Sequence, residues 1–308
     1  AAGLIGTQEK GAEQMYESIQ RFSELPDYIQ VWPGHGAGSA CGKALGAVPS
    51  STVGYEKIRN WALQYASDQK GFVDYLLDGQ PEPPKYFAKM KHLNKVERPL
   101  LVEVPKHSKL SKDQFQAAYK DGLKVIDTRD KVDFAKGFLP NSINIQGNNS
   151  FSTWAGWLLN YQEQFILVAD QSQMEDLTRK LMRIGLDNIY GFIDDVATVD
   201  IDLQTADLID IEEFKSLVGK DDVQVVDVRN TTEYSAGHVK GADHVFVGTL
   251  PENLDKISKD KKVVIHCQSG DRAAIAYSLL RKNGFENVKN YSGGMKEWLE
   301  KGNETVKN

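Results

Sequence analysis

The sequence predicts an α/β protein in which two tandem parallel-sheet domains follow a leading segment of a different kind. Short motifs recur in the same order about 100 residues apart, which indicates a duplicated domain. Within each copy, short runs of β-branched residues alternate with stretches of helical composition. This alternation is typical of a parallel sheet that is covered by helices on both faces.

Bulk composition narrows the class of protein. The 308 residues suffice for two or three domains, and 41% hydrophobic with 26% charged residues is ordinary for a soluble globular protein. No apolar run approaches the roughly 18 residues that cross a bilayer, and the start lacks a signal-peptide pattern. The net charge of -6 disfavours a nucleic-acid partner, which requires a basic surface. Two widely separated cysteines predict free thiols in a reducing cytoplasm.

The duplication predicts the domain boundaries. Four motifs recur at an offset of 99 or 100 residues: 111–115 and 210–214, 127–129 and 227–229, 137–142 and 237–242, and 183–189 and 282–288. They predict two sister domains over residues 99–203 and 204–308, after a leading segment over residues 1–98. The chain starts at Ala1 without an initiator methionine, so we expect it to be a piece of a longer protein.

The second sister shows its elements most clearly. We expect buried strands over residues 223–228 and 262–266, because both are short β-branched runs. A helix over residues 272–282 should end at Asn283-Gly284, which is a helix stop. In the leading segment, the composition predicts helices over 13–22 and 55–77 and a strand over 28–32.

Cys267 is the residue most suited to chemistry. It follows a predicted parallel strand and precedes a helix, which is where ligands bind in such sheets. Main-chain N–H groups of the loop and the positive end of the helix favour a thiolate, and the thiolate is the nucleophilic form. A thiolate held in this way can attack a sulfane sulfur and carry it as a persulfide. The loop consists of Cys267, Gln268, Ser269, Gly270, Asp271 and Arg272.

Residues 204–308 resemble the rhodanese family of sulfurtransferases. The matching motifs, in order, are Asp227-Val228-Arg229, residues 233–239, Val264-Ile265-His266-Cys267 and residues 291–298. The resemblance implies that the nucleophile is Cys267 and that the domain needs no cofactor. It also implies a loop that binds substrate, made of Gln268, Ser269, Gly270, Asp271 and Arg272. The supporting residues that it implies are Asp227, Arg229 and His238.

Loop length distinguishes two chemistries within the resemblance. Four residues separate Cys267 from Arg272, a spacing that suits one sulfur atom. Phosphatase and arsenate-reductase relatives of this fold carry one more residue, which widens the loop for an oxyanion. The short loop therefore favours sulfur transfer over hydrolysis of a phosphate ester.

The first sister retains the scaffold and lacks the nucleophile. Residues 165–170 match the strand before the active loop, so we expect Asp170 to replace the cysteine. A carboxylate cannot carry a persulfide, and we predict an inactive domain kept for packing, orientation or partner contact. The alternative is that Asp170 acts as a general base.

The leading segment resembles the C-terminal portion of a metallo-β-lactamase fold, near its glyoxalase II and persulfide dioxygenase branch. The motifs are Pro33-Gly34-His35-Gly36, residues 38–43 and residues 79–87. The resemblance implies Fe(II) in the complete dioxygenase domain, with His35 near the iron and Cys41 in the persulfide pocket. The alternatives are a hydrogen-bonded loop histidine and a small buried cysteine. No His-x-His-x-Asp-His run is present, and the six histidines lack metal-ligand spacing, so we assign no metal ligand.

Together these resemblances imply a persulfide dioxygenase–rhodanese fusion that detoxifies sulfide by way of sulfite and thiosulfate. The implied donors are a low-molecular-weight persulfide or thiosulfate, and the implied acceptors are sulfite or a thiol. The alternative is a persulfide or redox sensor, or a partner-binding module, that reacts once without turnover. The natural donor, the natural acceptor and the oligomeric state, including a homo-oligomer, stay open.

Overall fold

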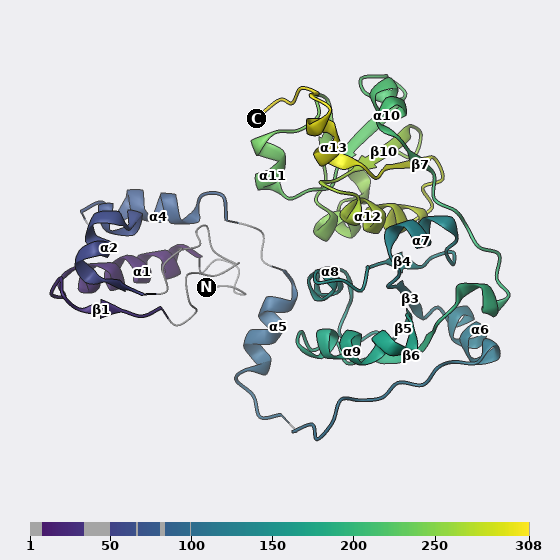
Figure 1. Ribbon diagram of the computed structural model, residues 1–308, viewed down its shortest axis with the longest axis horizontal. Helices are drawn as coiled ribbons and strands as arrows, with labels where there is room; N and C mark the ends of the chain where they lie inside the picture. Colours follow the sequence, from purple (N-terminus) through teal and green to yellow (C-terminus); the bar gives the residue numbers. More distant parts are fainter. Residues whose placement is uncertain (1–7, 34–49, 66, 81–83, 99, 308) are drawn as a thin grey trace. The chain divides into compact units, whose positions relative to one another are not determined.

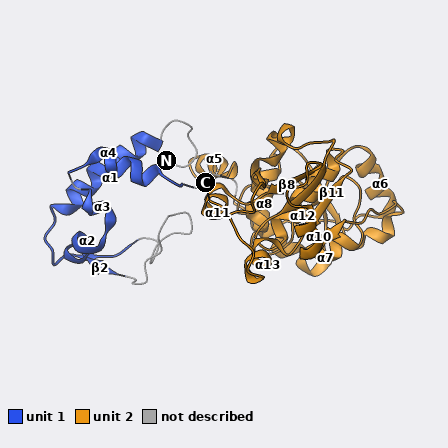
Figure 2. Cartoon of the chain, turned by 90° about the horizontal axis from the view of Figure 1, so that it is seen from above, with its two compact units in different colours: residues 1–83 blue, residues 84–308 orange. Residues whose placement is uncertain are grey.

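The computed structural model describes residues 8–33, 50–65, 67–80, 84–98 and 100–307. The chain divides into two compact units, residues 1–83 and 84–308 (Figure 2). His35 and Cys41, predicted for the dioxygenase pocket, lie outside the described residues. Within the described residues, no helix combines the length and apolar character that a membrane crossing requires.

The first unit is built mainly of helices. Its described elements are α1 (Gln8–Ser23), β1 (Gln30–Val31), β2 (Ser51–Thr52), α2 (Val53–Arg59), α3 (Trp61–Gln64) and α4 (Gln69–Leu77). Strands β1 and β2 pair antiparallel, and Phe72 of α4 is buried against Trp61 at a ring distance of 5.7 Å.

The predicted continuous helix over residues 55–77 is wrong, because two polar side chains interrupt it. Asn60 accepts a hydrogen bond from the amide of Ala62 at 3.1 Å, and Asp68 accepts one from Gly71 at 2.8 Å. Each side chain satisfies an amide at the start of a helix and so begins a new one. The segment therefore forms α2, α3 and α4.

The second unit begins with α5 (Tyr86–Leu93) and then contains two parallel sheets (Figure 1). The first sheet has the strand order β4-β3-β5-β6. The elements of this domain, in which η denotes a 3-10 helix, are α6 (Lys112–Lys120), β3 (Lys124–Asp127), α7 (Lys131–Lys136), β4 (Ile143–Asn144), α8 (Phe151–Leu158), β5 (Phe165–Val168), η1 (Gln171–Gln173), α9 (Met174–Met182), β6 (Ile189–Ile193) and η2 (Val196–Val199).

The second sheet has the order β7-β11-β10-β8-β9, and all its pairs are parallel. Its elements are β7 (Leu208–Ile209), α10 (Ile211–Leu217), β8 (Val223–Asp227), α11 (Thr231–Ala236), β9 (Asp243–His244), η3 (Val247–Glu252), η4 (Leu254–Lys256), β10 (Lys262–His266), α12 (Asp271–Lys282), β11 (Val288–Tyr291) and α13 (Gly294–Glu300). Two tandem parallel-sheet α/β domains are thus confirmed.

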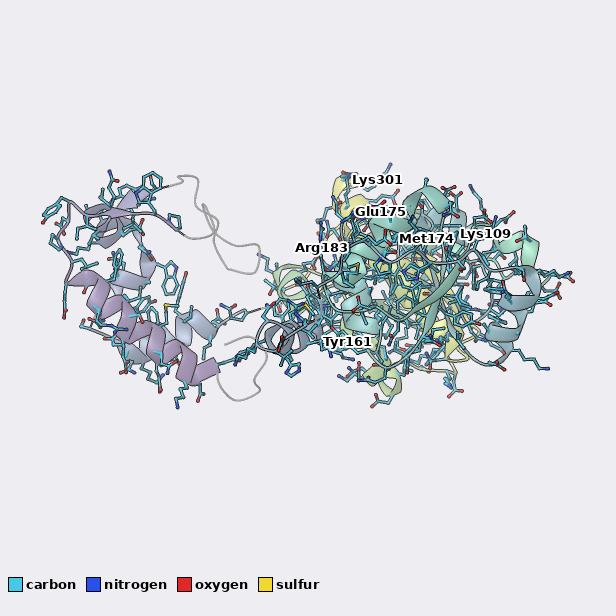
Figure 3. All side chains as sticks on the ribbon, turned by 90° about the horizontal axis from the view of Figure 1, so that it is seen from below. Lys109, Tyr161, Met174, Glu175, Arg183 and Lys301 are labelled. Atoms are coloured by element: carbon cyan, nitrogen blue, oxygen red, sulfur yellow. The ribbon has the colours of Figure 1, made fainter. Side chains whose placement is uncertain are left out.

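Helix α5 packs on the first sheet domain, although the sequence assigns residues 1–98 to the leading segment. A Cβ atom on Gly156 of α8 would lie 2.2 Å from the Tyr86 ring, so the two helices approach closely. Lys89 lies 5.2 Å from the ring centre of Tyr161, which is labelled in Figure 3, and burial raises the pKa of Tyr161 to about 12. The boundaries at 98/99 and 203/204 stay predictions.

One apolar core is shared by the two sheet domains. Along β10 the side chains alternate, so Val263 and Ile265 face a core that also contains Phe151 of the first domain, whereas Val264 faces a separate core. Cys267 belongs to the shared core and therefore lies on the side of its sheet that faces the first domain.

Helix α12 forms much of the contact between these domains. It lies beside α7 and packs on β4 (Figure 1). The amide of Asn144 on β4 donates to the Ser278 hydroxyl of α12 at 3.1 Å, and this hydrogen bond is buried. The helix that begins at the Cys267 loop is therefore held by both domains.

Strand register identifies the residue that replaces the cysteine. In the second sheet, the pairing of β10 with β8 ends at His266, directly before Cys267. In the first sheet, the corresponding pairing of β5 with β3 ends at Val168. The next residue is Ala169, so the prediction of Asp170 is wrong by one position. Matching of residue types could not show where each strand stops pairing. The inference of a missing nucleophile holds, because a methyl group cannot carry sulfur.

Candidate functional site

The loop of Cys267 connects β10 to the N-terminus of α12. The amide of Gly270 donates a hydrogen bond to Sγ of Cys267 at 3.1 Å. Gly270 has φ +93°, and a Cβ atom there would lie 2.6 Å from the carbonyl oxygen of Ser292. Only glycine fits this backbone conformation and this close approach, so Gly270 sets the position of the amide that faces the sulfur.

The start of α13 holds the loop from its other side. The amide of Met295 donates to the Cys267 carbonyl at 2.8 Å, and that of Lys296 donates to the Gln268 carbonyl at 2.9 Å. Gly294 has φ +62°, and a Cβ atom on it would lie 2.5 Å from the Cys267 carbonyl oxygen. Two main-chain hydrogen bonds from α13 therefore hold the backbone of Cys267 and Gln268 in place.

The loop residues differ in their exposure. Cys267 is 1% exposed, Gly270 is buried, Gln268 is half-buried and Ser269 lies exposed at the tip. A reactant can therefore reach Sγ only if the side chains around the loop move. This degree of enclosure also excludes bulk water, which would otherwise hydrate a sulfur anion.

Arg272 forms a bidentate ion pair with Glu233 on α11. Nη2 donates to Oε1 at 2.8 Å, and Nη1 donates to Oε2. Burial would lower the pKa of Arg272, but the hydrogen bond to Glu233 and the negative charge of that carboxylate raise it. Sequence reasoning missed Glu233 as a site residue, although its spacing from Asn230 is that of the capping box observed at α11.

Asp227 and Arg229, predicted as supporting residues, form a buried ion pair at the end of β8. Arg229 Nη2 donates to Asp227 Oδ2 at 2.7 Å and to the Gly237 carbonyl at 2.8 Å. Burial would raise the pKa of Asp227, but the positive charge of Arg229 and its hydrogen bonds hold that pKa below its ordinary value. The neighbouring His266 cannot supply this charge, since burial lowers its own pKa and keeps it neutral near pH 7. The pair therefore joins β8 to the segment after α11.

His238, the third predicted supporting residue, contacts α11 and the end of the chain. Its ring stacks on Tyr234 at 3.8 Å, and its Nδ1 lies 3.0 Å from the Tyr234 carbonyl oxygen. Its backbone pairs with Val306 in both directions. These contacts give His238 a bracing position.

His266 should make the stability of this chain depend on pH. Burial lowers its pKa, so below about pH 6.5 the unfolded chain binds a proton that the folded chain does not. We therefore expect the full contribution of His266 to the free energy of unfolding above that pH. As the pH decreases below it, the free energy of unfolding should fall by up to about 1.4 kcal/mol per pH unit. Urea unfolding of the His266→Gln variant should show a flatter profile than the parent. At about pH 6, above the range in which carboxylates titrate, His107 should account for the remaining slope, because burial also lowers its pKa. An unchanged slope there would contradict the assignment.

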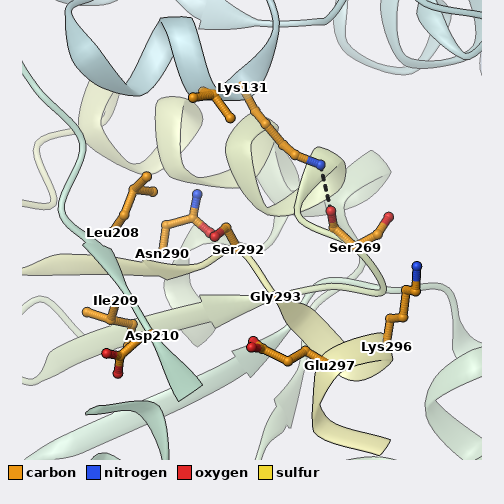
Figure 4. A pocket seen from close by; sticks show the side chains of 11 residues that line it. Lys131, Leu208, Ile209, Asp210, Ser269, Asn290, Ser292, Gly293, Lys296 and Glu297 are labelled. Atoms are coloured by element: carbon orange, nitrogen blue, oxygen red, sulfur yellow. Dashed lines mark hydrogen bonds between the residues drawn. The ribbon is translucent and has the colours of Figure 1, made fainter. Parts of the chain in front are cut away.

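A cavity of about 630 Å³ opens beside the loop (Figure 4). Its lining includes Ser269 of the loop, Asn290 at the end of β11, and Lys296 and Glu297 of α13. The first domain contributes Lys131, whose ammonium donates to the Ser269 carbonyl at 2.6 Å. This side of the candidate site is therefore built by both domains.

The corresponding position of the first domain has no group suited to sulfur transfer. Ala169 is buried, and Asp170 is exposed and accepts hydrogen bonds from the amide and hydroxyl of Ser172. These bonds lower the pKa of Asp170, which weakens it as the general base of the alternative interpretation. Among the residues that the structure describes, no group of His, Cys, Asp and Glu side chains could hold a metal ion.

The duplicated parallel sheet and the single cysteine loop define a class, namely tandem α/β-domain proteins with a thiol at a strand-to-helix junction. More particularly, the chain belongs to the rhodanese-like domain family, whose model matches residues 111–196 and 210–301.

Two curated relatives resemble parts of the chain. The uncharacterized protein YqhL of Bacillus subtilis is 37% identical over 87 residues, which cover 28% of this chain and 68% of YqhL. The tRNA uridine(34) hydroxylase of Acinetobacter baylyi is 34% identical over 116 residues, which cover 34% of this chain and 37% of that protein. The chain thus spans about a third of the hydroxylase.

A solved structure resembles the chain over more than half of its length. The metallo-beta-lactamase from Staphylococcus aureus matches 61% of this chain and 52% of its own, at 38% identity and a TM-score of 0.50. This likeness agrees with the resemblance of the leading segment to a portion of the metallo-β-lactamase fold.

Proposed function

We propose that this chain is a sulfurtransferase that moves sulfane sulfur through a persulfide on Cys267. The observation that carries the proposal is the hydrogen bond from the Gly270 amide to Sγ, at the N-terminus of the 12-residue helix α12. Both the amide and the helix end favour negative charge on sulfur. Membership of the rhodanese-like family supports the same chemistry.

The transfer balances without an external oxidant or reductant. With thiosulfate as donor, the Cys267 thiolate attacks the outer sulfur and forms a new S–S bond. The bond to the sulfonate sulfur breaks, and its electron pair leaves with sulfite. An acceptor such as cyanide, sulfite or a thiolate then attacks the outer sulfur of the persulfide and regenerates the Cys267 thiolate. The Gly270 amide stabilises the anion on Cys267 before the attack and after release.

Turnover distinguishes this proposal from a sensor. Purified protein incubated with thiosulfate should gain one sulfur atom on the peptide that contains Cys267, as measured by mass spectrometry. With cyanide added, it should form many equivalents of thiocyanate. A single equivalent followed by arrest would favour the sensing alternative, and no sulfur on Cys267 from thiosulfate or from a glutathione-type persulfide would refute transfer.

We further propose that the chain is part of a persulfide dioxygenase–rhodanese fusion of sulfide detoxification. The likeness of the leading segment to a metallo-β-lactamase portion supports this, and sulfite made by a dioxygenase would be an acceptor for Cys267 in the same molecule. The described residues include no group of side chains that could hold a metal ion, and the sulfur transfer proposed for Cys267 uses no iron. The test is the coding sequence upstream of Ala1, where a His-x-His-x-Asp-His run is expected, together with iron analysis of the product.

The hydroxylase relative is named for a reaction on tRNA, and we do not propose that activity for this chain. The net charge of -6 provides no overall basic surface for a polyanion.

A further inference from the structure

We propose that the domain without a cysteine positions the active loop of its sister, with Lys131 as the positioning residue. Lys131 is the first residue of α7, in the first domain. Its ammonium binds two groups of the Cys267 loop, the main-chain carbonyl of Ser269 at 2.6 Å and the carboxylate of Asp271. The inactive domain would thus be retained because it completes the active one.

The first domain contacts both carboxylate oxygens of Asp271. Lys131 binds Oδ1, and the amide nitrogen of Asn148, also in the first domain, lies 3.5 Å from Oδ2. Asp271 is the first residue of α12, and Ser269 lies between Asp271 and Cys267 in the chain. Fixing both groups fixes the turn that presents the Gly270 amide to sulfur.

Charge gives Lys131 a second effect. A carboxylate at the N-terminus of α12 stabilises the helix but disfavours a thiolate four residues earlier in the same loop. The Lys131 ammonium offsets the Asp271 charge, whereas the charge of Arg272 is already paired with Glu233. Lys131 therefore favours the anionic form of Cys267 without touching its sulfur.

This contact depends on the packing of the two domains. The buried hydrogen bond between Asn144 and Ser278 holds α12 against β4, and this packing brings the start of α12 within reach of Lys131. At the equivalent first position of α11, the second domain has Thr231, which carries no charge. Because Lys131 is 27% exposed and Asp271 41% exposed, their ion pair contributes little to global stability.

The test compares Lys131→Met with the parent and with a matched control on the same helix. Lys136→Met is the control, because Lys136 pairs with Asp133 and belongs to no part of the site. We expect Lys131→Met to lower kcat for thiosulfate–cyanide transfer about tenfold, since loop misplacement affects chemistry more than binding. The pH profile of Cys267 alkylation by iodoacetamide should shift to higher pH, while the thermal unfolding midpoint stays near that of the parent.

Two further variants separate geometry from charge. Lys131→Arg should recover part of the alkylation rate, because it keeps the charge. Lys131→Met combined with Asp271→Asn should move the pH profile back toward the parent, since neither charge remains. A rise in KM alone would overturn the positioning role and assign Lys131 to anion binding in the cavity of Figure 4.

The inference rests on the proposed function only for its turnover readout. An inactive parent would refute sulfur transfer, and the alkylation profile would still test the position of the loop. An unchanged alkylation profile in Lys131→Met would refute the inference, even if the parent turns over.

Discussion

Replacing Cys267 with serine should abolish sulfur transfer while the fold stays intact. A serine hydroxyl can accept the Gly270 hydrogen bond, and serine is close in volume to the buried cysteine. An alkoxide is inaccessible at neutral pH, and oxygen cannot hold a sulfane sulfur as a persulfide does. Thiocyanate formation should fall to the rate without enzyme, a loss of at least about a thousandfold for a removed nucleophile.

The measurement pairs steady-state turnover with thermal unfolding. Cys267→Ala should be equally inactive, because the defect is the missing sulfur and not the shape of the side chain. If either variant turned over thiosulfate at a rate near that of the parent, Cys267 would not be the carrier. In that case, peptide mapping should be directed at Cys41, the other cysteine of the chain.

The Arg229→Met variant should lose about 3–5 kcal/mol of unfolding free energy, the cost of breaking a buried ion pair. The side chains of Arg229 and Asp227 are 5% and 0% exposed, so removal of the cation leaves a buried carboxylate without its partner. The Gly237 carbonyl loses its donor as well. Urea denaturation at neutral pH gives the free energy directly.

The duplicated domain supplies a matched control for this prediction. Arg129 and Asp127 form the same ion pair, but the Arg129 side chain is 26% exposed. Water can therefore reach Asp127 in Arg129→Met, and we expect a smaller loss than in Arg229→Met. Equal losses of unfolding free energy in the two variants would show that burial of the ion pair does not determine the size of the loss. A loss below about 1 kcal/mol in Arg229→Met would show that the Asp227–Arg229 pair contributes little to the stability of the fold.

Local pattern predicted the strand that positions Cys267. The run over residues 262–266 was expected as a strand and forms β10 with the same limits. Its β-branched residues are buried on both faces, which is what a central parallel strand requires. Cys267 follows directly, and the helix expected at 272 begins one residue earlier at Asp271.

Side-chain hydrogen bonding and strand pairing produced the errors. The polar caps at Asn60 and Asp68 divide a stretch whose composition is helical throughout, because each satisfies an amide that a continuous helix would not leave open. The replacement of the cysteine by Ala169 became visible only from strand register.

The sequence by itself determined the duplicated α/β architecture and the place of Cys267 at a strand end, because periodicity and repeated motifs are local properties. Only the tertiary structure decided that Glu233 pairs with Arg272 and that Lys131 reaches the loop, 138 and 140 residues away from its two partners. Such pairs form where separate surfaces meet, and nothing in the spacing of residues along a chain encodes which surface faces a given side chain.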